Sequence, residues 1–151
     1  MSSELPEIGL RAIGVVRSRV KEPPPAGYPW HNEVSEIAIE ANLTQALDGL
    51  EDFSHIIVLY WTHRAAGGEL APKIHPMGNP ELPLVGRLAT RSPSRPNRIA
   101  LSTARLLQRQ ANILKVQGLD ALDGSPVIDI KPYIPGSDSP PDARVPQWVP
   151  R

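Results

Sequence analysis

The sequence predicts a mainly β fold with one or two short helices, on three observations. Of the 151 residues, 18 are proline, and proline breaks the interior of a helix, so a helical bundle is excluded. The apolar runs are short and rich in β-branched residues, as strands are. Apolar residues make up 40% and charged residues 21% of the chain, which is typical of a globular protein, and the length fits one domain over residues 1–151.

The first third of the chain predicts two strands, a loop and a helix. Residues 8–16 are short and β-rich, which predicts a first strand. Residues 21–29 hold four prolines and predict a stiff loop. Residues 35–40 alternate polar and apolar side chains, which predicts a half-buried strand. Residues 42–49 predict a short helix, with Asn42 as its N-cap and Gly49 as its end.

The middle of the chain predicts a buried strand and a long connection. Residues 56–61 are six apolar residues in a row, so residues 54–63 predict a strand that is covered on both faces. Residues 64–83 are rich in glycine and proline, and a connection of that length in a small domain is usually functional or mobile. Residues 84–90 predict a further strand.

Residues 99–117 allow two interpretations. Helix propensity favours a helix, and the alternative is two strands that turn near residues 110–112. After them, residues 127–133 predict a last strand that Pro132 interrupts. The proline-rich tail, residues 135–151, is expected to be extended over the surface.

Positive charge is concentrated in one stretch, although the formal net charge of the whole chain is zero. Residues 85–119 hold seven basic side chains and no aspartate or glutamate: Arg87, Arg91, Arg95, Arg98, Arg105, Arg109 and Lys115. A surface that faces a polyanion such as nucleic acid would have this composition. The alternative is a solvated pair of strands with arginines at the tips.

Several kinds of chemistry are absent from the sequence. Without cysteine there are no disulfides, thiolate nucleophiles or zinc–thiolate sites, and no phosphate-binding loop or HExxH motif is present. His55 and His63 are eight residues apart, which would place them on one face of the presumed strand, and two hydrogen-bonded histidines explain them better than a metal site. Asp48, Glu51 and Asp52 are interpreted as a solvated turn. The polar start of the chain and the lack of a long apolar run predict a cytoplasmic protein that binds no membrane.

Two segments carry polar side chains in arrangements that suit a binding site. Pro93 and Pro96 restrict the backbone around Arg91, Arg95 and Asn97, so these side chains are pre-organised to bind phosphate, carboxylate or a base edge. The alternative is that the arginines pair with carboxylates, although Glu81 and Asp120 are the nearest acids in the sequence.

The second segment is the last predicted strand. Asp129, Lys131 and Tyr133 alternate onto one face of it. They would form either a polar site or an ordinary salt-bridged surface.

Four strings of residues carry a family resemblance. Residues 13–18 read Ile-Gly-Val-Val-Arg-Ser, and residues 49–63 read Gly-Leu-Glu-Asp-Phe-Ser-His-Ile-Ile-Val-Leu-Tyr-Trp-Thr-His. Residues 89–97 read Ala-Thr-Arg-Ser-Pro-Ser-Arg-Pro-Asn, and residues 122–133 read Leu-Asp-Gly-Ser-Pro-Val-Ile-Asp-Ile-Lys-Pro-Tyr. In these strings, over about residues 8–138, the chain resembles the TsaA/TrmO family (YaeB-like proteins) of S-adenosylmethionine-dependent tRNA methyltransferases.

The resemblance implies a single-sheeted β-barrel, with residues 99–117 as a hairpin instead of a helix. It also implies an enzyme that binds S-adenosylmethionine (SAM) near a homodimer interface and methylates the exocyclic nitrogen of N6-threonylcarbamoyladenosine beside the tRNA anticodon. The residues that it implies for binding SAM are Pro25, Ala26, Gly27, His63, Arg64, Arg91, Leu101, Leu119, Asp120, Leu122, Asp123 and Gly124.

The resemblance also frames the remaining functional predictions. Arg95, Asn97, Arg105 and Arg109 are predicted to bind RNA, with Arg95 facing the carboxylate of the modified base. Asp129, Lys131 and Tyr133 are predicted to be catalytic, with Asp129 as the base, and no metal is expected.

The chain departs from the family pattern at three places. Leu88 stands where phenylalanine is usual, residues 98–100 stand where Pro-Ile-Gly is usual, and the C-terminal extension of longer members is absent. A SAM-binding barrel without catalysis, or a methyltransferase acting on another RNA or a small molecule, is therefore the alternative.

Overall fold

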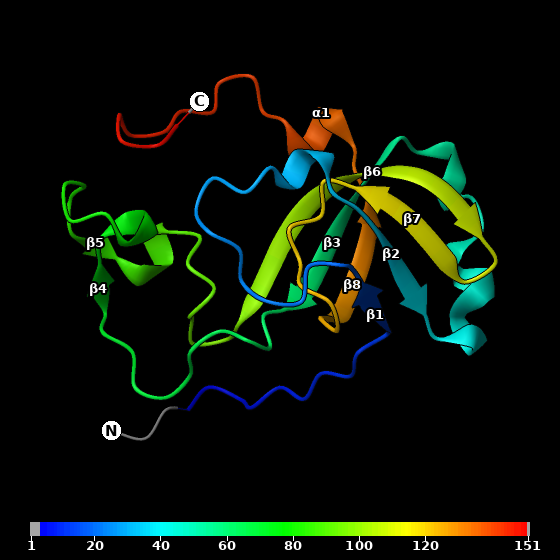
Figure 1. The fold of residues 1–151 in the computed structure, drawn as a ribbon, viewed down its shortest axis with the longest axis horizontal. Helices are drawn as coiled ribbons and strands as arrows, with labels where there is room; N and C mark the ends of the chain where they lie inside the picture. The colour runs from blue at the N-terminus through cyan, green and yellow to red at the C-terminus, as the bar shows by residue number, and fades with distance from the viewer. Residues whose placement is uncertain (1–3, 151) are drawn as a thin grey trace.

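Six antiparallel strands close into a barrel in the computed structural model, which describes residues 4–150 (Figure 1). Around the barrel the strand order is β1-β2-β7-β6-β3-β8. The strands are β1 (Gly14–Arg17), β2 (Val34–Ile39), β3 (His55–Trp61), β6 (Ile99–Gln110), β7 (Ile113–Gln117) and β8 (Pro126–Pro132). The predicted mainly β fold with a barrel is confirmed.

The barrel interior is an apolar core built from alternate residues of the strands. Ile56, Val58 and Tyr60 point inward from β3, while the residues between them are only half-buried. The fully buried side chains that join them include Val16, Ile37, Leu114, Val116 and Val127. The prediction that β3 is covered on both faces is wrong, because a barrel has one layer and its outer face has no second sheet against it.

Residues 99–117 form the hairpin of β6 and β7, so the interpretation as a helix is wrong. Ala111 sits in the turn with a φ of 54°, and the Asn112 side chain donates to the carbonyl of Ile39 at 2.6 Å. Strand β6 pairs with β3 on one side and β7 on the other, and this pairing outweighs helix propensity. A register shift between Leu106 and Gln108 breaks the alternation that would have marked the strand.

The helices are short and almost all of 3₁₀ type. They are η1 (Trp30–Asn32), η2 (Ala41–Leu47), η3 (Leu50–Asp52), η4 (Pro76–Gly78), η5 (Arg87–Ala89) and α1 (Pro135–Asp138). The predicted helix over 42–49 corresponds to η2. It is preceded by Glu40 and has no side-chain cap, so the assignment of Asn42 as N-cap is wrong. Gly49, with a φ of 91°, separates η2 from η3 in a conformation that favours glycine.

Two predicted strands are shorter in the structure. The first begins only at Gly14, since Ile8 and Leu10 are 79% and 55% exposed and have no neighbouring strand to pair with. Of residues 84–90, only β5 (Val85–Gly86) pairs, with β4 (Lys73–Ile74), and η5 follows at once.

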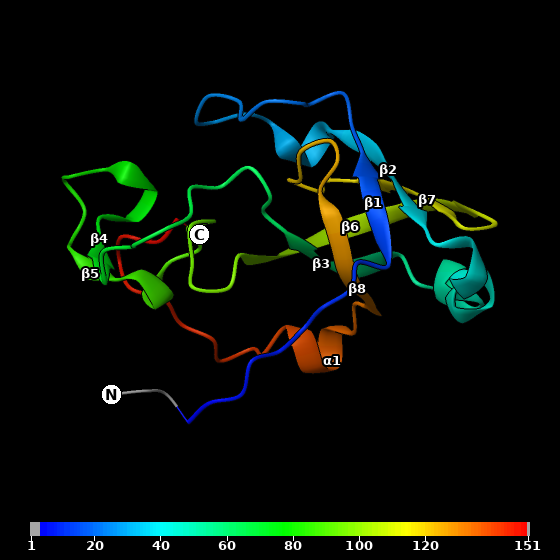
Figure 2. The ribbon, with the colours of Figure 1, turned by 90° about the horizontal axis from the view of Figure 1, so that it is seen from below.

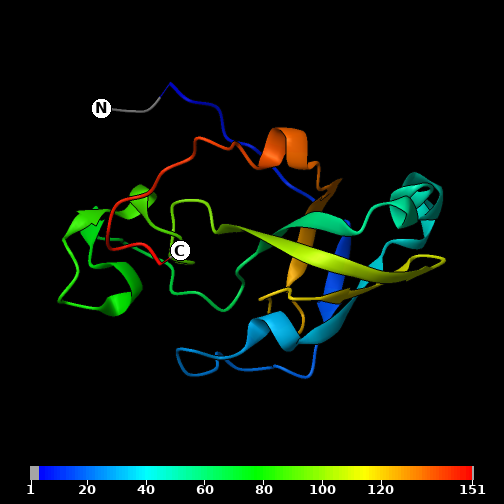
Figure 3. The same cartoon turned by 90° about the horizontal axis from the view of Figure 1, so that it is seen from above.

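Residues 64–98 leave the barrel and form a lobe around the β4–β5 pair. Figures 2 and 3 show this lobe at one end of the molecule and η2 and η3 at the other. The C-terminal tail runs from α1 in the direction of the lobe (Figure 1). Within residues 4–150, no helix combines the length and the apolar character needed to cross a bilayer.

The connection from β1 to β2 is held by a buried carboxylate. Glu33 is 4% exposed, pairs with Nε of Arg19 at 2.9 Å and accepts a hydrogen bond from the hydroxyl of Tyr28. Together, Arg19 and Tyr28 lower the pKa of Glu33. These contacts hold the loop that carries Pro23, Pro24 and Trp30.

Candidate functional site

Four connections meet around a cavity of about 560 Å³ at the end of β3. They are the β1–β2 loop, the end of β3 with the start of the lobe, the lobe segment that leads into β6, and the β7–β8 connection. The lining residues are Pro23, Pro24, Trp30, Tyr60, Thr62, His63, Arg64, Ala65, Arg91, Ser92, Pro93, Arg95, Ile99, Ala100, Leu101, Asp120, Leu122 and Ser125.

Half of the residues predicted to bind SAM line this cavity. They are His63, Arg64, Arg91, Leu101, Asp120 and Leu122, and Arg95 from the predicted RNA set lines it too. The others lie beside it or beneath it. Pro25, Ala26 and Gly27 follow the lining residue Pro24, and Leu119 is fully buried in the core. The Asp123 carboxylate accepts a hydrogen bond from the backbone of Ser18 at 2.9 Å, next to Gly124.

Sequence reasoning missed several lining residues. Tyr60 is the last inward-facing residue of β3, so its position at the mouth of the barrel could have been found from the strand's alternation. Thr62 follows the strand, and its hydroxyl donates to the carbonyl of Pro93 at 3.0 Å. Trp30 follows the proline-rich loop, and the resemblance implied Pro25, Ala26 and Gly27 of that loop but not Trp30 itself.

Tyr60 and Asp120 form a hydrogen-bonded pair in the cavity wall. The Tyr60 hydroxyl donates to Oδ1 of Asp120 at 2.8 Å and lies 3.1 Å from the carbonyl oxygen of the same residue. Burial, followed by the charge of Asp120, raises the pKa of Tyr60. The phenol therefore stays protonated and acts as a donor.

His63 has a buried ring nitrogen without a partner. Its Nδ1 makes no hydrogen bond to any described residue, although the atom is inaccessible to solvent. A Cβ at Gly124 would lie 3.7 Å from its Nε2, so the ring is in contact with the β7–β8 connection. Because β3 ends at Trp61, His63 lies beyond the strand, and the prediction that it shares one strand face with His55 is wrong.

Three arginines hold the lobe by donating hydrogen bonds to backbone carbonyls, and we call these three residues the arginine anchors. Arg87 donates to Ala71 at 2.8 Å and to Ser94 at 2.9 Å. Arg95 donates through Nη1 to Thr90 at 2.7 Å and to Ser92 at 3.2 Å. Arg98 donates to Ala65 at 2.9 Å and lies over the ring of Trp61. The acceptors are neutral, so the positive charge of the stretch is not cancelled.

Arg91 is the exposed cation of the cavity. No hydrogen bond or ion pair engages its side chain within residues 4–150. Arg64, in contrast, pairs with Glu22 at 2.7 Å and reaches the carbonyl of Lys21 at 3.3 Å, which closes the wall against the β1–β2 loop.

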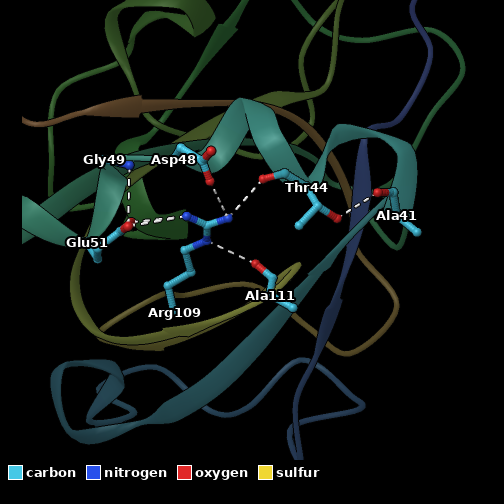
Figure 4. A network of polar contacts seen from close by, with 7 residues as sticks. All are labelled: Ala41, Thr44, Asp48, Gly49, Glu51, Arg109 and Ala111. Atoms are coloured by element: carbon cyan, nitrogen blue, oxygen red, sulfur yellow. Dashed lines mark hydrogen bonds and ion pairs between the residues drawn. The ribbon is translucent and has the colours of Figure 1, made fainter.

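Arg109 holds the acidic turn after η2. Its side chain is 11% exposed and pairs with Asp48 at 2.9 Å and Glu51 at 3.3 Å (Figure 4). It also donates to the carbonyls of Thr44 and Ala111. The acidic turn therefore binds Arg109 and is not simply solvated, and RNA contact by Arg109 stays a prediction. Backbone hydrogen bonds and Arg109 lower the pKa of Glu51.

Arg105 and Asn97, the remaining residues of the predicted RNA set, lie outside the cavity. Both are exposed. Arg105 projects from β6, opposite His55 of β3 in the register of the sheet.

The three predicted catalytic residues are not brought into the cavity. Asp129 and Lys131 are 44% and 59% exposed and pair at 3.0 Å, which matches the alternative of a salt-bridged surface. Tyr133 follows β8 and meets His55 edge to face at 6.3 Å. Among the residues that the structure describes, no group of three histidine, aspartate or glutamate side chains is placed to hold a metal ion.

The comparisons with known proteins agree with this geometry. A model of the tRNA-methyltransferase O N-terminal domain matches residues 16–139. The chain is 47% identical over 135 residues to a probable S-adenosyl-L-methionine-binding protein of Methanothermobacter thermautotrophicus, covering 88% of this chain and 95% of that protein. It is 38% identical to the tRNA (adenine(37)-N6)-methyltransferase of Escherichia coli, covering 87% of this chain and 60% of that enzyme.

The solved structures point the same way. A crystal structure of TrmO superposes with a TM-score of 0.75 at 33% identity, covering 92% of this chain and 63% of that one. The chain thus spans nearly all of the Methanothermobacter relative and about three-fifths of the Escherichia coli enzyme and of the TrmO crystal structure. The chain belongs to the tRNA-methyltransferase O N-terminal domain family.

Proposed function

We propose that the chain is a tRNA methyltransferase that transfers the methyl group of SAM to the exocyclic nitrogen of N6-threonylcarbamoyladenosine beside the anticodon. One observation carries the proposal. In a barrel of this family, the unpaired guanidinium of Arg91, the unpartnered Nδ1 of His63 and the Tyr60–Asp120 pair line one cavity. Relatives with this domain are described as SAM-binding proteins and as tRNA (adenine(37)-N6)-methyltransferases.

The cavity residues fit the methyl donor. A volume of about 560 Å³ lies within the range of small-molecule sites, roughly 300–1,000 Å³. Trp30, Leu101 and Leu122 offer apolar surface to an adenine ring, and Nδ1 of His63 is a buried polar atom that still needs a partner. When bound, SAM supplies an electrophilic methyl group whose transfer leaves a neutral thioether.

The work of the protein is alignment and exclusion of water. Arg95 lines the cavity with Nη1 already bonded to two carbonyls, which holds its guanidinium in place, and we propose that it faces the threonine carboxylate of the substrate. Arg91 and Arg95, which both line the cavity, keep positive charge where negative charge develops on the attacking nitrogen. Tyr60 is no candidate for the base, because its pKa is raised.

Methyl transfer from labelled SAM to tRNA tests the proposal directly. We expect mass spectrometry of the digested nucleosides to find one methyl group on threonylcarbamoyladenosine, and none in tRNA that lacks the threonylcarbamoyl group. Labelling of another nucleoside would favour the alternative of a different RNA substrate. Binding of SAM with no labelled product in any tRNA pool would indicate a SAM-binding barrel without this catalysis.

The outer face of the barrel offers cations to the tRNA backbone. Arg105 on β6 is exposed, and its side chain makes no hydrogen bond or ion pair in the described part of the chain. Replacing Arg105 with alanine is expected to make the negative slope of log affinity against log salt shallower by roughly 0.7–0.9, the range for one released counterion. Filter binding at several salt concentrations measures it.

The matched control for that change is Arg11→Ala. Arg11 is also exposed, but it already pairs with Glu40 at 2.9 Å, so its loss should leave the slope unchanged. An Arg105→Ala slope equal to that of the native chain would remove Arg105 from the RNA surface.

We propose further that two chains form a homodimer through the outer face of β3 and the first residues of β6, which leaves Arg105, farther along β6, to the RNA. Ile57 and Leu59 are only half-buried there, and Leu101, which also lines the cavity, is 48% exposed. A catalytic role for Asp129 and Lys131 on the adjoining β8, and for Tyr133 directly after it, depends on such a dimer. Sedimentation velocity that finds monomers at every concentration would oppose it. We also propose a cytoplasmic location, which a tRNA substrate supports and cell fractionation tests.

A further inference from the structure

Asp120 is out of place in a site for RNA. It supplies the single carboxylate among the described residues that line the cavity, and the other charged groups there are Arg64, Arg91 and Arg95. A polyanion whose modified base carries a further carboxylate would be repelled by Asp120. A carboxylate in this position is explained if it meets a positively charged group of another ligand.

The position of Asp120 is fixed by Tyr60. The phenol is 5% exposed and belongs to β3, which is paired on both sides in the barrel. Its hydroxyl contacts both Oδ1 and the backbone carbonyl oxygen of Asp120, so the carboxylate is held in one orientation. No described residue donates to Oδ2, which therefore remains available to a ligand.

SAM carries two positive groups, the sulfonium and the α-ammonium of its methionine part. Only the ammonium has N–H donors that can satisfy a carboxylate oxygen. Its neighbour in the same amino-acid group is a carboxylate, and Arg91 is the unpaired cation of the same cavity. One acid and one arginine together match an α-amino acid.

We propose that Asp120, oriented by Tyr60, binds the α-ammonium of SAM while Arg91 binds its carboxylate. In this arrangement Tyr60 is a positioning residue that acts through Asp120. The inference rests on the proposed function, because it takes SAM as the occupant of the cavity.

Three ligands separate the possible contacts of Asp120. S-adenosylhomocysteine keeps the ammonium and lacks the sulfonium charge, and methylthioadenosine lacks both. The binding of SAM and of these two compounds to the full chain is measured by isothermal titration. Asp120→Asn should lower the affinity for SAM and for S-adenosylhomocysteine about tenfold. The affinity for methylthioadenosine should stay within about twofold of the native value.

Each other pattern overturns the proposal. If Asp120→Asn lowers the affinity for SAM alone, Asp120 contacts the sulfonium. A loss for all three ligands would place it at the ribose or adenine, and no loss would remove it from the ligand. The matched control is Asp52→Asn, an exposed aspartate outside the cavity, which should change none of the three affinities.

Tyr60→Phe tests the positioning role. This variant should have about threefold lower affinity for SAM. The Tyr60→Phe/Asp120→Asn double variant should bind SAM no more weakly than Asp120→Asn alone. Independent, additive losses would mean that Tyr60 acts by another route, even if thermal midpoints are unchanged. If the native chain binds none of the three ligands, the proposed function fails as well, whereas native binding with the wrong pattern defeats this inference alone.

Discussion

Replacing Arg91 with alanine is expected to weaken the binding of SAM about a hundredfold, or roughly 2.7 kcal/mol. Arg91 lines the cavity, no described residue neutralises it, and the arginine anchors around it hold the segment that carries it. A charge-assisted hydrogen bond to the donor's carboxylate would therefore be lost without a substitute. Isothermal titration with SAM, and the rate of methyl transfer at low SAM, measure the effect.

Two further variants make this result interpretable. Arg91→Lys keeps the charge but loses the planar fork, so we expect it to recover only part of the affinity. Arg144→Ala removes an exposed arginine from the C-terminal tail, outside the cavity, and should bind SAM as the native chain does. An Arg91→Ala chain that binds SAM within about twofold of the native affinity would take Arg91 out of the donor site.

Replacing Gly14 with alanine is expected to destabilise the barrel by about 3 kcal/mol. A Cβ at this position would lie 2.5 Å from the carbonyl oxygen of Ala38 and about 3 Å from atoms of Ile39. Gly14 pairs with Ile39 on one side and Val127 on the other, so β1 has no free side toward which to shift. Chemical denaturation measures the loss, which corresponds to a fall of roughly 10 °C in the thermal midpoint.

Gly86→Ala is the control for this prediction. Gly86 lies in β5, and a Cβ there would meet nothing within 4 Å. Its free energy of unfolding should change by less than about 0.5 kcal/mol. Equal stability of the two variants would show that the barrel can adjust around residue 14.

The strands that the sequence predicted well are those whose alternation is unbroken. Residues 35–40 correspond to β2 within one residue at each end, because Ser35, Ile37 and Ile39 point inward without interruption. Residues 99–117 are ambiguous because the adjacent Leu106 and Leu107 break the alternation of a strand, at the point where the register shifts in the structure. The family resemblance, and not periodicity, gave the hairpin and the barrel.

Whether a site residue could be predicted from the sequence depended on how far away in the sequence its partners lie. Arg91 and Arg95 were found because Pro93 and Pro96 mark a local, rigid turn. The contacts of Arg109 and Tyr60 could not be predicted from the sequence, because each residue has partners about 60 residues away. Only the closed barrel brings those partners near. No local pattern encodes such a contact.

The arginine anchors also bear on how the molecule responds to acid. Glu33 has a lowered pKa, so its stabilisation of the β1–β2 loop is complete above the ordinary range of a glutamate and is lost as the pH falls through that lowered value. Arg87, Arg95 and Arg98 donate to peptide carbonyls, which do not take up protons in this range. Acidification should therefore loosen the β1–β2 loop first. The lobe should stay folded, with its guanidinium groups still charged.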